Sequence, residues 1–274
     1  MTEHRLVSPD DEDYPEGLLD LENPPPLFML GETTTAPAVA VVGTRRSTRY
    51  GMNLAGAFGR ALARAGWTTV SGLARGIDAA AHRGTLEADG QAVAVLGSGI
   101  DVVYPAEHGE IYHRILDGHG AVMSEYPPGT PPDRWRFPAR NRLIAAIASA
   151  VVVVEAGEKG GALITARLAA ELGRPVFAVP GDVDRAASKG CNLLIRDGAH
   201  PALGVEDLIA ELELVLGKPL RRPPPTRITI PPTGVTIDDL PGLWGCTPAQ
   251  ALARLARMEI AGEVRRSGDL VAPI

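Results

Sequence analysis

Glycines beside arginines or lysines follow several of the short apolar runs in this chain. Guanidinium and ammonium groups pair with phosphate oxygens, and glycine lets backbone amides approach a bound anion closely. A mononucleotide needs one such cluster, whereas several clusters in a row suit a polymer of phosphates. We therefore predict a nucleic-acid-binding surface. Its candidate residues are Gly43, Thr44, Arg45, Arg46, Gly72, Arg75, Gly76, Lys159, Gly160, Gly161, Ser188, Lys189 and Asn192.

A second basic stretch, at positions 134–142, holds four arginines and two aromatic residues. Arginines neutralise phosphates and aromatic rings stack on bases, so this stretch also suits nucleic acid. The alternative is that Trp135 and Phe137 are core anchors while the arginines pair with acids, and we expect both interpretations to hold in part. Arg140 and Arg142 oppose the dipole of a helix predicted to start there, so we expect an anion beside them, either a carboxylate or a phosphate.

Signatures of catalysis are weak by comparison. The chain has neither the GxGxxG fingerprint of dinucleotide sites nor a Walker A loop. Asp78 and His82 have the spacing of a general-base pair, but no nucleophile is near in sequence. We favour a helix cap for Asp78 and a local hydrogen bond for His82. The sequence therefore predicts no catalytic residue, no cofactor and no metal site.

Short apolar runs alternate with alanine-rich helical patterns between positions 38 and 216. The runs are continuous rather than alternating, which indicates strands covered on both faces. This pattern predicts an α/β fold with an extended, Rossmann-like, doubly wound parallel sheet. The predicted strands are 38–42, 67–71, 92–96, 121–124, 151–155 and 176–179, and the predicted helices are 51–65, 78–88, 140–148, 162–172 and 205–216.

Such a sheet positions the candidate residues, because ligands bind beyond the carboxyl ends of parallel strands. The alternative for the first cluster is a solvated basic turn, but we favour phosphate binding because Arg45 and Arg46 follow the first strand at this edge. We also expect free amides at the start of the helix that follows, ready for a phosphate. Lys159 with Gly160 and Gly161 opens another helix and predicts a second phosphate cradle.

Composition shifts divide the chain into four parts. Residues 1–37 form a lead-in arm, residues 38–216 the Rossmann-like domain, residues 217–232 a proline-rich linker, and residues 233–274 a small winged-helix-like domain. In the last part, 235–240 and 247–258 are predicted to be helical, and 262–271 to be a hairpin with a Ser-Gly-Asp turn.

The formal net charge is −6, from 27 Lys and Arg against 33 Asp and Glu. This excludes a protein coated in positive charge but leaves room for a local basic groove. Cys191 and Cys246 are far apart and lack CxxC spacing, which is typical of a reducing compartment. The sequence shows no signal peptide and no membrane span, so we expect a cytoplasmic protein.

In order along the chain, these motifs resemble the DNA processing protein A (DprA, or Smf) family. Val41–Val42–Gly43–Thr44–Arg45 is similar to its GSR-type element, with Thr in place of Ser. Positions 71–78 with His82 match SGxAxGID...H, positions 137–142 match its FPxRNR stretch, and Pro180–Gly181 matches as well. The KGGALITA stretch at positions 159–166 differs from the SGS-type sequence that is commoner in the family.

The resemblance implies a non-enzymatic protein that binds and protects single-stranded DNA, forms a homodimer, and loads a RecA-type recombinase during natural transformation. It implies DNA contacts at Arg45 and at Lys159 to Gly161.

Two other functions compete. A nucleotide hydrolase of the lonely-guy type has a similar core, but the 160–167 stretch lacks the second glycine and the catalytic glutamate of its PGGxGTxxE loop. Glu155 and Asp101 remain as carboxylates, and buried structural roles are favoured for both. Alternatively, the winged helix is the main DNA reader. From Arg221 onward there are seven arginines against five acids, a weak excess.

Overall fold

The structure is a computed structural model that describes residues 4–11, 13–32, 36–219, 234–244, 248–260 and 264–273. The chain divides into two compact units, 1–221 and 222–274, which are described separately. Most of the predicted proline-rich linker lies outside the described residues.

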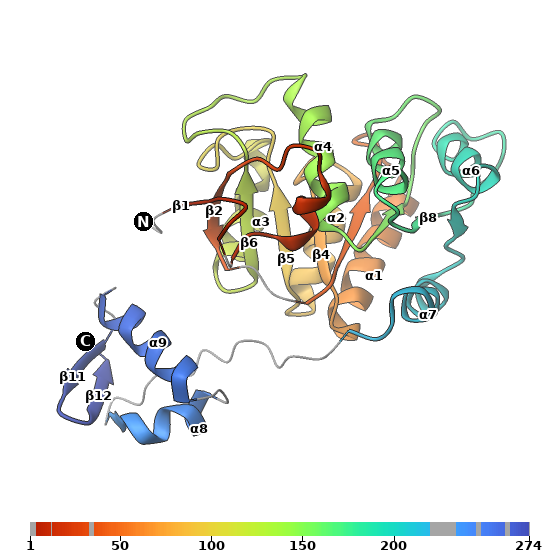
Figure 1. Cartoon of the computed structure of the whole chain (residues 1–274). Helices are drawn as coiled ribbons and strands as arrows, with labels where there is room; N and C mark the ends of the chain where they lie inside the picture. The colour runs from red at the N-terminus through yellow and green to blue at the C-terminus, as the bar shows by residue number, and fades with distance from the viewer. Residues whose placement is uncertain are drawn as a thin grey trace. The chain divides into compact units, whose positions relative to one another are not determined.

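A nine-stranded sheet forms the centre of the first unit (Figure 1), in the order β1-β2-β6-β5-β4-β3-β7-β8-β9. From β6 to β9 all neighbouring strands are parallel, which confirms the doubly wound α/β fold. The parallel strands are β3 (Ala38–Val42), β4 (Thr68–Ser71), β5 (Ala92–Val95), β6 (Gly120–Ser124), β7 (Ala150–Val153), β8 (Val176–Ala178) and β9 (His200–Pro201).

The lead-in segment extends this sheet. Strand β2 (Leu27–Gly31) pairs antiparallel with β6, and β1 (Arg5–Val7) pairs antiparallel with β2. Between them the short 3-10 helix η1 (Glu16–Asp20) packs against helix α4 (Arg136–Ile147). The predicted lead-in arm therefore contributes two strands to the sheet, and Leu27 and Met29 are fully buried in the core.

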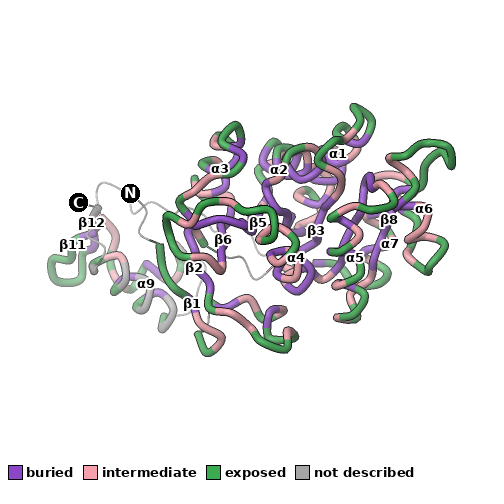
Figure 2. Tube along the Cα trace, turned by 90° about the horizontal axis from the view of Figure 1, so that it is seen from above, coloured by how far each residue is buried: buried purple, intermediate pink, exposed green. Residues whose placement is uncertain are grey.

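Helices cover both faces of the sheet, and Figure 2 shows α1, α2 and α3 on the side opposite α4 and α5. Alternate residues of β3 explain this: Val39 and Val41 pack with the α1, α2 and α7 side, whereas Ala40 and Val42 pack with α4 and α5. The helices are α1 (Arg49–Ala65), α2 (Ile77–Glu87), α3 (Gly109–Leu116), α4 (Arg136–Ile147), α5 (Gly161–Glu171), α6 (Lys189–Arg196) and α7 (Val205–Leu216). Among the described helices, none combines the length and the apolar composition that a membrane span requires.

Helices α1 and α2 pack backbone to backbone through glycines. A Cβ on Gly84 would lie 2.0 Å from the carbonyl oxygen of Gly56, and one on Gly59 would lie 2.2 Å from that of Ala81. Real Cβ atoms do not approach backbone so closely, so the glycines set how near the two helices lie. The loops that precede both helices are thereby held together at the carboxyl edge of the sheet.

Replacing Gly84 with alanine should separate these helices. We expect the free energy of unfolding to fall by about 1–3 kcal/mol, because overpacking outweighs alanine's better helix propensity. Gly109→Ala at the start of α3 is the matched control, since nothing lies within 4 Å of its Cβ position. Urea unfolding followed by circular dichroism measures both. Equal stability of the two variants would contradict this account of the packing.

The second unit contains α8 (Leu240–Trp244), α9 (Pro248–Ile260) and a three-stranded sheet, β10-β12-β11, with a core that includes Leu240, Leu255 and Val271. The predicted hairpin is confirmed as β11 (Val264–Ser267) and β12 (Leu270–Pro273). The predicted helix at 235–240 is wrong at its start: β10 (Val235–Thr236) pairs with β12, and a 3-10 turn (Ile237–Asp239) follows. The winged-helix interpretation stays a prediction.

Candidate nucleic-acid interface

A crevice opens where β3 and β7 lie side by side. The chain leaves β3 toward α1 on one face of the sheet, and leaves β7 toward α5 on the other. Their connecting loops therefore diverge, which is where doubly wound sheets bind ligands. A cavity of about 300 Å³ lies there. Its lining includes Gly43, Thr44, Arg45, Arg46, Asp78, Phe137, Arg140, Asn141, Gly160, Gly161 and Thr165.

The loop after β3 is tied to the end of β7 by Glu155. This buried carboxylate accepts hydrogen bonds from the backbone N–H of Thr48 (2.8 Å) and from its hydroxyl. The Thr48 hydroxyl oxygen in turn accepts from the Gly51 N–H, and a Cβ on Gly51 would lie 2.3 Å from the Glu155 carboxyl carbon. The structural role expected for Glu155 is confirmed. The expectation of free amides at this helix start is wrong for Thr48 and Gly51, whose N–H groups bond to Glu155 and to the Thr48 hydroxyl.

Arg45 and Arg46 are exposed beside this loop. The Arg45 guanidinium carbon lies 4.5 Å from the centre of the Phe137 ring, and Phe137 also stacks with Tyr104 at 5.5 Å between ring centroids. Within the described ranges, neither arginine pairs with a carboxylate. Phe137 thus orients Arg45 by a cation–π contact while leaving its N–H groups available to an anion.

Arg140, by contrast, is part of the floor of the crevice. It is 3% exposed and donates to the carbonyl oxygens of Gly72 (2.8 Å) and Val95. Burial lowers its pKa to about 10, and the neighbouring Asp78 opposes that shift. Helix α4 starts at Arg136, earlier than predicted, so Arg140 lies in its second turn rather than at its start. We correct its assignment from a phosphate ligand to a structural residue.

Asp78 lies under the same loop. Its carboxylate accepts from the N–H groups of Gly72 (3.1 Å) and Ala74 (3.4 Å), and burial raises its pKa against the opposing charge of Arg140. It is the second residue of α2 and not its N-cap, a position that Gly76 takes. A Cβ on Gly72 would lie 2.4 Å from the Arg140 guanidinium, so the glycine admits this arginine.

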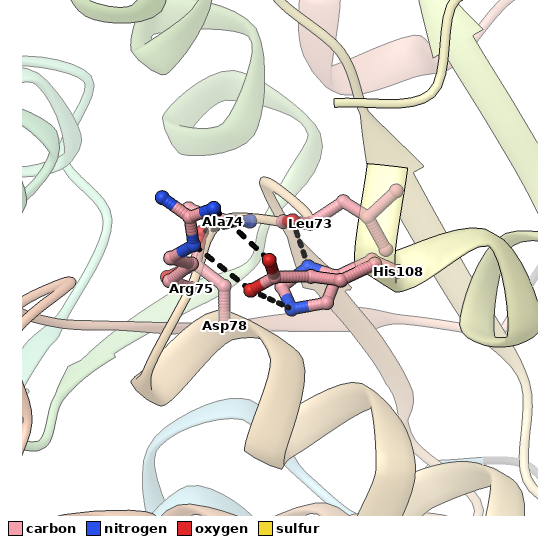
Figure 3. A network of polar contacts seen from close by, with 6 residues as sticks. Leu73, Ala74, Arg75, Asp78 and His108 are labelled. Carbon is pink, nitrogen blue, oxygen red and sulfur yellow. Dashed lines mark hydrogen bonds and ion pairs between the residues drawn. The ribbon is translucent and has the colours of Figure 1, made fainter. Parts of the chain in front are cut away.

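Two further arginines are paired with the protein's own acids. Arg142 contacts Glu125 at 2.5 Å, so the anion expected beside it is a carboxylate. Arg75 is exposed but holds Glu107 with two hydrogen bonds of 2.8 and 3.0 Å, beside the buried His108 (Figure 3). Its neighbour Gly76 has φ +79°, and its Cβ position would be 2.5 Å from the Thr44 carbonyl oxygen.

The opposite wall of the crevice is the start of α5. Gly160 is its N-cap, and no side chain caps the helix. Lys159 is exposed just before it, and the Asn141 side chain donates to the Gly161 carbonyl oxygen (3.2 Å). An uncapped helix start with an adjacent ammonium group favours anions.

The third basic loop, which contains Ser188 and Lys189, lies next to the crevice but does not line the cavity. The Gly190 N–H at the start of α6 donates to the Ala156 carbonyl oxygen (2.8 Å), which places Ser188 and Lys189 beside the loop after β7. Lys189 is exposed. Asn192 uses its side-chain amide to bond both the N–H and the carbonyl of Gly181, so its role is to hold the loop.

His82 differs from its expected role. It is fully buried, and neither ring nitrogen has a hydrogen-bond partner of normal geometry. Burial, followed by the charge of His108, lowers its pKa to about 3, while the backbone of Ser71 opposes the shift. In the described residues no group of three or more His, Cys, Asp or Glu side chains could hold a metal ion. Cys191 is a buried free thiol, and Cys246 lies outside the described residues.

Known proteins resemble this chain over most of its length. The family profile described as DNA recombination-mediator protein A matches residues 5–213. Protein Smf of Synechocystis sp. is 43% identical over 215 residues, 76% of this chain and 54% of that protein, so the chain spans about half of that relative. A putative DNA processing protein DprA of Mycobacterium tuberculosis is 40% identical over 288 residues, 94% of this chain and 74% of its own.

Two solved structures share the fold. DNA processing protein A of Streptococcus pneumoniae has a TM-score of 0.70 and 38% identity, covering 76% of this chain and 74% of its own. DNA processing protein A of Helicobacter pylori, whose single-stranded DNA binding mode has been described structurally, has a TM-score of 0.68 and 29% identity. That match covers 77% of this chain and 95% of its own.

Proposed function

The chain belongs to the DNA recombination-mediator protein A family, and from this premise we propose that it binds single-stranded DNA along the crevice between β3 and β7. The phosphates contact Arg45 and Arg46 on one wall, and Lys159 with the α5 amides of Gly160 and Gly161 on the other. Lys189 extends the basic edge beyond the crevice.

The observation that carries this proposal is that three basic side chains beside the crevice are exposed and unpaired among the described residues. Around the crevice, the carboxylates of Glu155, Asp78 and Glu107 are bonded within the protein. Arg45, Arg46 and Lys159 are exposed and lack carboxylate partners in the part of the chain described. Arginine binds phosphate bidentately, and the uncapped α5 start favours a negative charge. The relative from Helicobacter pylori, whose single-stranded DNA binding mode has been described structurally, supports the same ligand.

We further propose that the protein acts in the cytoplasm as a homodimer, protects incoming DNA, and loads a RecA-type recombinase in natural transformation. These roles rest on the family and not on the geometry of the crevice. Binding and positioning of DNA need no catalytic residue, and we propose that the protein is not an enzyme.

The hydrolase alternative would need a free carboxylate in the crevice. Glu155 is held by Thr48, and Asp101 accepts from the Gly129 N–H (2.7 Å). Asp101 was expected to be buried but is exposed, and its hydrogen bond with Gly129 still gives it a structural role. Incubation with nucleoside monophosphates should therefore release no free base.

The direct test compares three DNA ligands of equal length in a gel shift: oligo-dT, a mixed single strand and the corresponding duplex. We expect binding to both single strands at lower protein concentration than to the duplex. A chain truncated after Arg221 should keep this preference, because the crevice lies entirely in the first unit. Preference for the duplex, or loss of binding on truncation, would instead place the DNA reader in residues 222–274.

A further inference from the structure

Trp135 is an aromatic side chain without a burial role. It is 59% exposed, although it stands directly before α4 and close to the crevice. It is therefore not the core anchor that the sequence allowed. We propose that the indole face of Trp135 stacks on a base of the bound single strand, just outside the crevice. This inference rests on the proposed function and adds a base contact to it.

Neighbouring side chains hold the indole in place. The Tyr126 ring meets Trp135 edge-on, with 6.1 Å between centroids and an 89° angle between planes. The Arg136 guanidinium carbon lies 5.1 Å from the centres of both rings, and Arg136 also donates to the Pro131 carbonyl oxygen. A fixed ring loses little conformational entropy when a ligand stacks on it, so this arrangement favours binding.

The position fits a strand leaving the crevice. Trp135 precedes Phe137 by two residues. Phe137 lines the cavity, and its ring contacts the Arg45 guanidinium. Two residues span at most about 7 Å even when extended. The backbone of Trp135 therefore lies close to that of Phe137, which contacts Arg45. Arg136 packs on both rings and donates to the Pro131 carbonyl oxygen, and the contact proposed at this point is made by the indole with a base.

Stacking on an indole has a signature distinct from charge neutralisation. Every base has a π-face, so the contact is independent of sequence. It releases no counterion, so removing it should lower affinity without changing the salt dependence. An alternative occupant, a protein partner seated on Trp135, predicts no effect on DNA binding by the purified protein.

The test uses the 274-residue chain with Trp244→Phe, which leaves Trp135 and the buried Trp67 (1% exposed) as its only indoles. We expect oligo-dT to quench the fluorescence. Trp135→Ala should weaken oligo-dT binding by about 5- to 150-fold, whereas Trp135→Phe should retain most of the affinity. Leu214→Ala, a change of another exposed apolar side chain, on α7, is the control and should have no effect.

An abasic oligonucleotide of the same length, which keeps every phosphate, completes the design. Trp135→Ala and the parent should bind it equally. Equal binding of oligo-dT by both proteins, no quenching, or an equal loss on the abasic strand would each overturn the stacking contact. Failure of the parent protein to bind any single strand would overturn the proposed function itself. Circular dichroism shows whether Trp135→Ala is folded. If it is not, the affinity of Trp135→Phe and the fluorescence titration of the parent decide whether Trp135 stacks on a base.

Discussion

Arg140→Ala should lower the free energy of unfolding by about 3–5 kcal/mol, the cost of removing one charge from a buried set. Its guanidinium satisfies the carbonyl oxygens of Gly72 and Val95, at the ends of β4 and β5, and offsets the buried carboxylate of Asp78. Alanine leaves both carbonyls without their donor and Asp78 without its compensating charge. Urea unfolding of the full chain, followed at the first unit's transition, measures the loss.

Two variants separate charge from geometry at this position. Arg140→Lys keeps the positive charge but loses the planar fork, and should fall between wild type and alanine. Arg167→Ala on the exposed face of α5 removes the same side chain without burial, and should change stability by less than about 0.5 kcal/mol. If Arg140→Ala were as stable as Arg167→Ala, the structural role assigned to Arg140 would be untenable.

The stability of the first unit should fall steeply in acid because of His82. In the unfolded chain this imidazole has a pKa near 6.5, whereas in the folded protein burial lowers the pKa to about 3. Between these values the unfolded state binds more protons, so stability is complete above pH 6.5 and is lost as pH falls. From pH 6.5 to pH 4 the loss attributable to His82 is about 3 kcal/mol.

The comparison that isolates this effect is His82→Gln, whose side chain does not titrate. We expect this variant to be less stable than wild type near pH 7, and to lose about 3 kcal/mol less between pH 6.5 and 4. Other titrating groups affect both proteins equally and cancel in the difference. Parallel curves of unfolding free energy against pH would show that His82 is protonated within the fold.

Local sequence patterns predicted the bounds of an element well where its apolar residues form a continuous run or a regular helical period. Strand β3 and helix α7 have the predicted bounds, because continuous apolar runs and a 3.6-residue period are local signals. Helices α3 and α6 were not predicted: both are short, and α6 begins with Lys189–Gly190. Strand β2 was expected only as part of the lead-in arm, because its identity as a strand depends on antiparallel pairing with the distant β6.

The sequence predicted which loops form the candidate site, but not which of its arginines are bonded to other groups of the protein. Glycine and arginine spacing identified the loops after β3, β4 and β7, since parallel strands bring their carboxyl ends to one edge. Which arginines remain free depends on long-range partners, such as Glu125 for Arg142 and the Gly72 carbonyl for Arg140. Neither these partners nor the neighbouring placement of β3 and β7 has a local sequence signal.

If the positively charged side chains of the crevice bind the phosphates of single-stranded DNA, the affinity for oligo-dT must depend on salt. This salt dependence is the most direct test. Each phosphate contact removed should flatten the slope of log K against log salt by about 0.7. We predict that Arg45→Ala/Lys159→Ala binds more weakly, with a slope smaller by about 1.4, while Arg60→Ala on α1 keeps the wild-type slope. A double variant with wild-type affinity and slope would contradict the account.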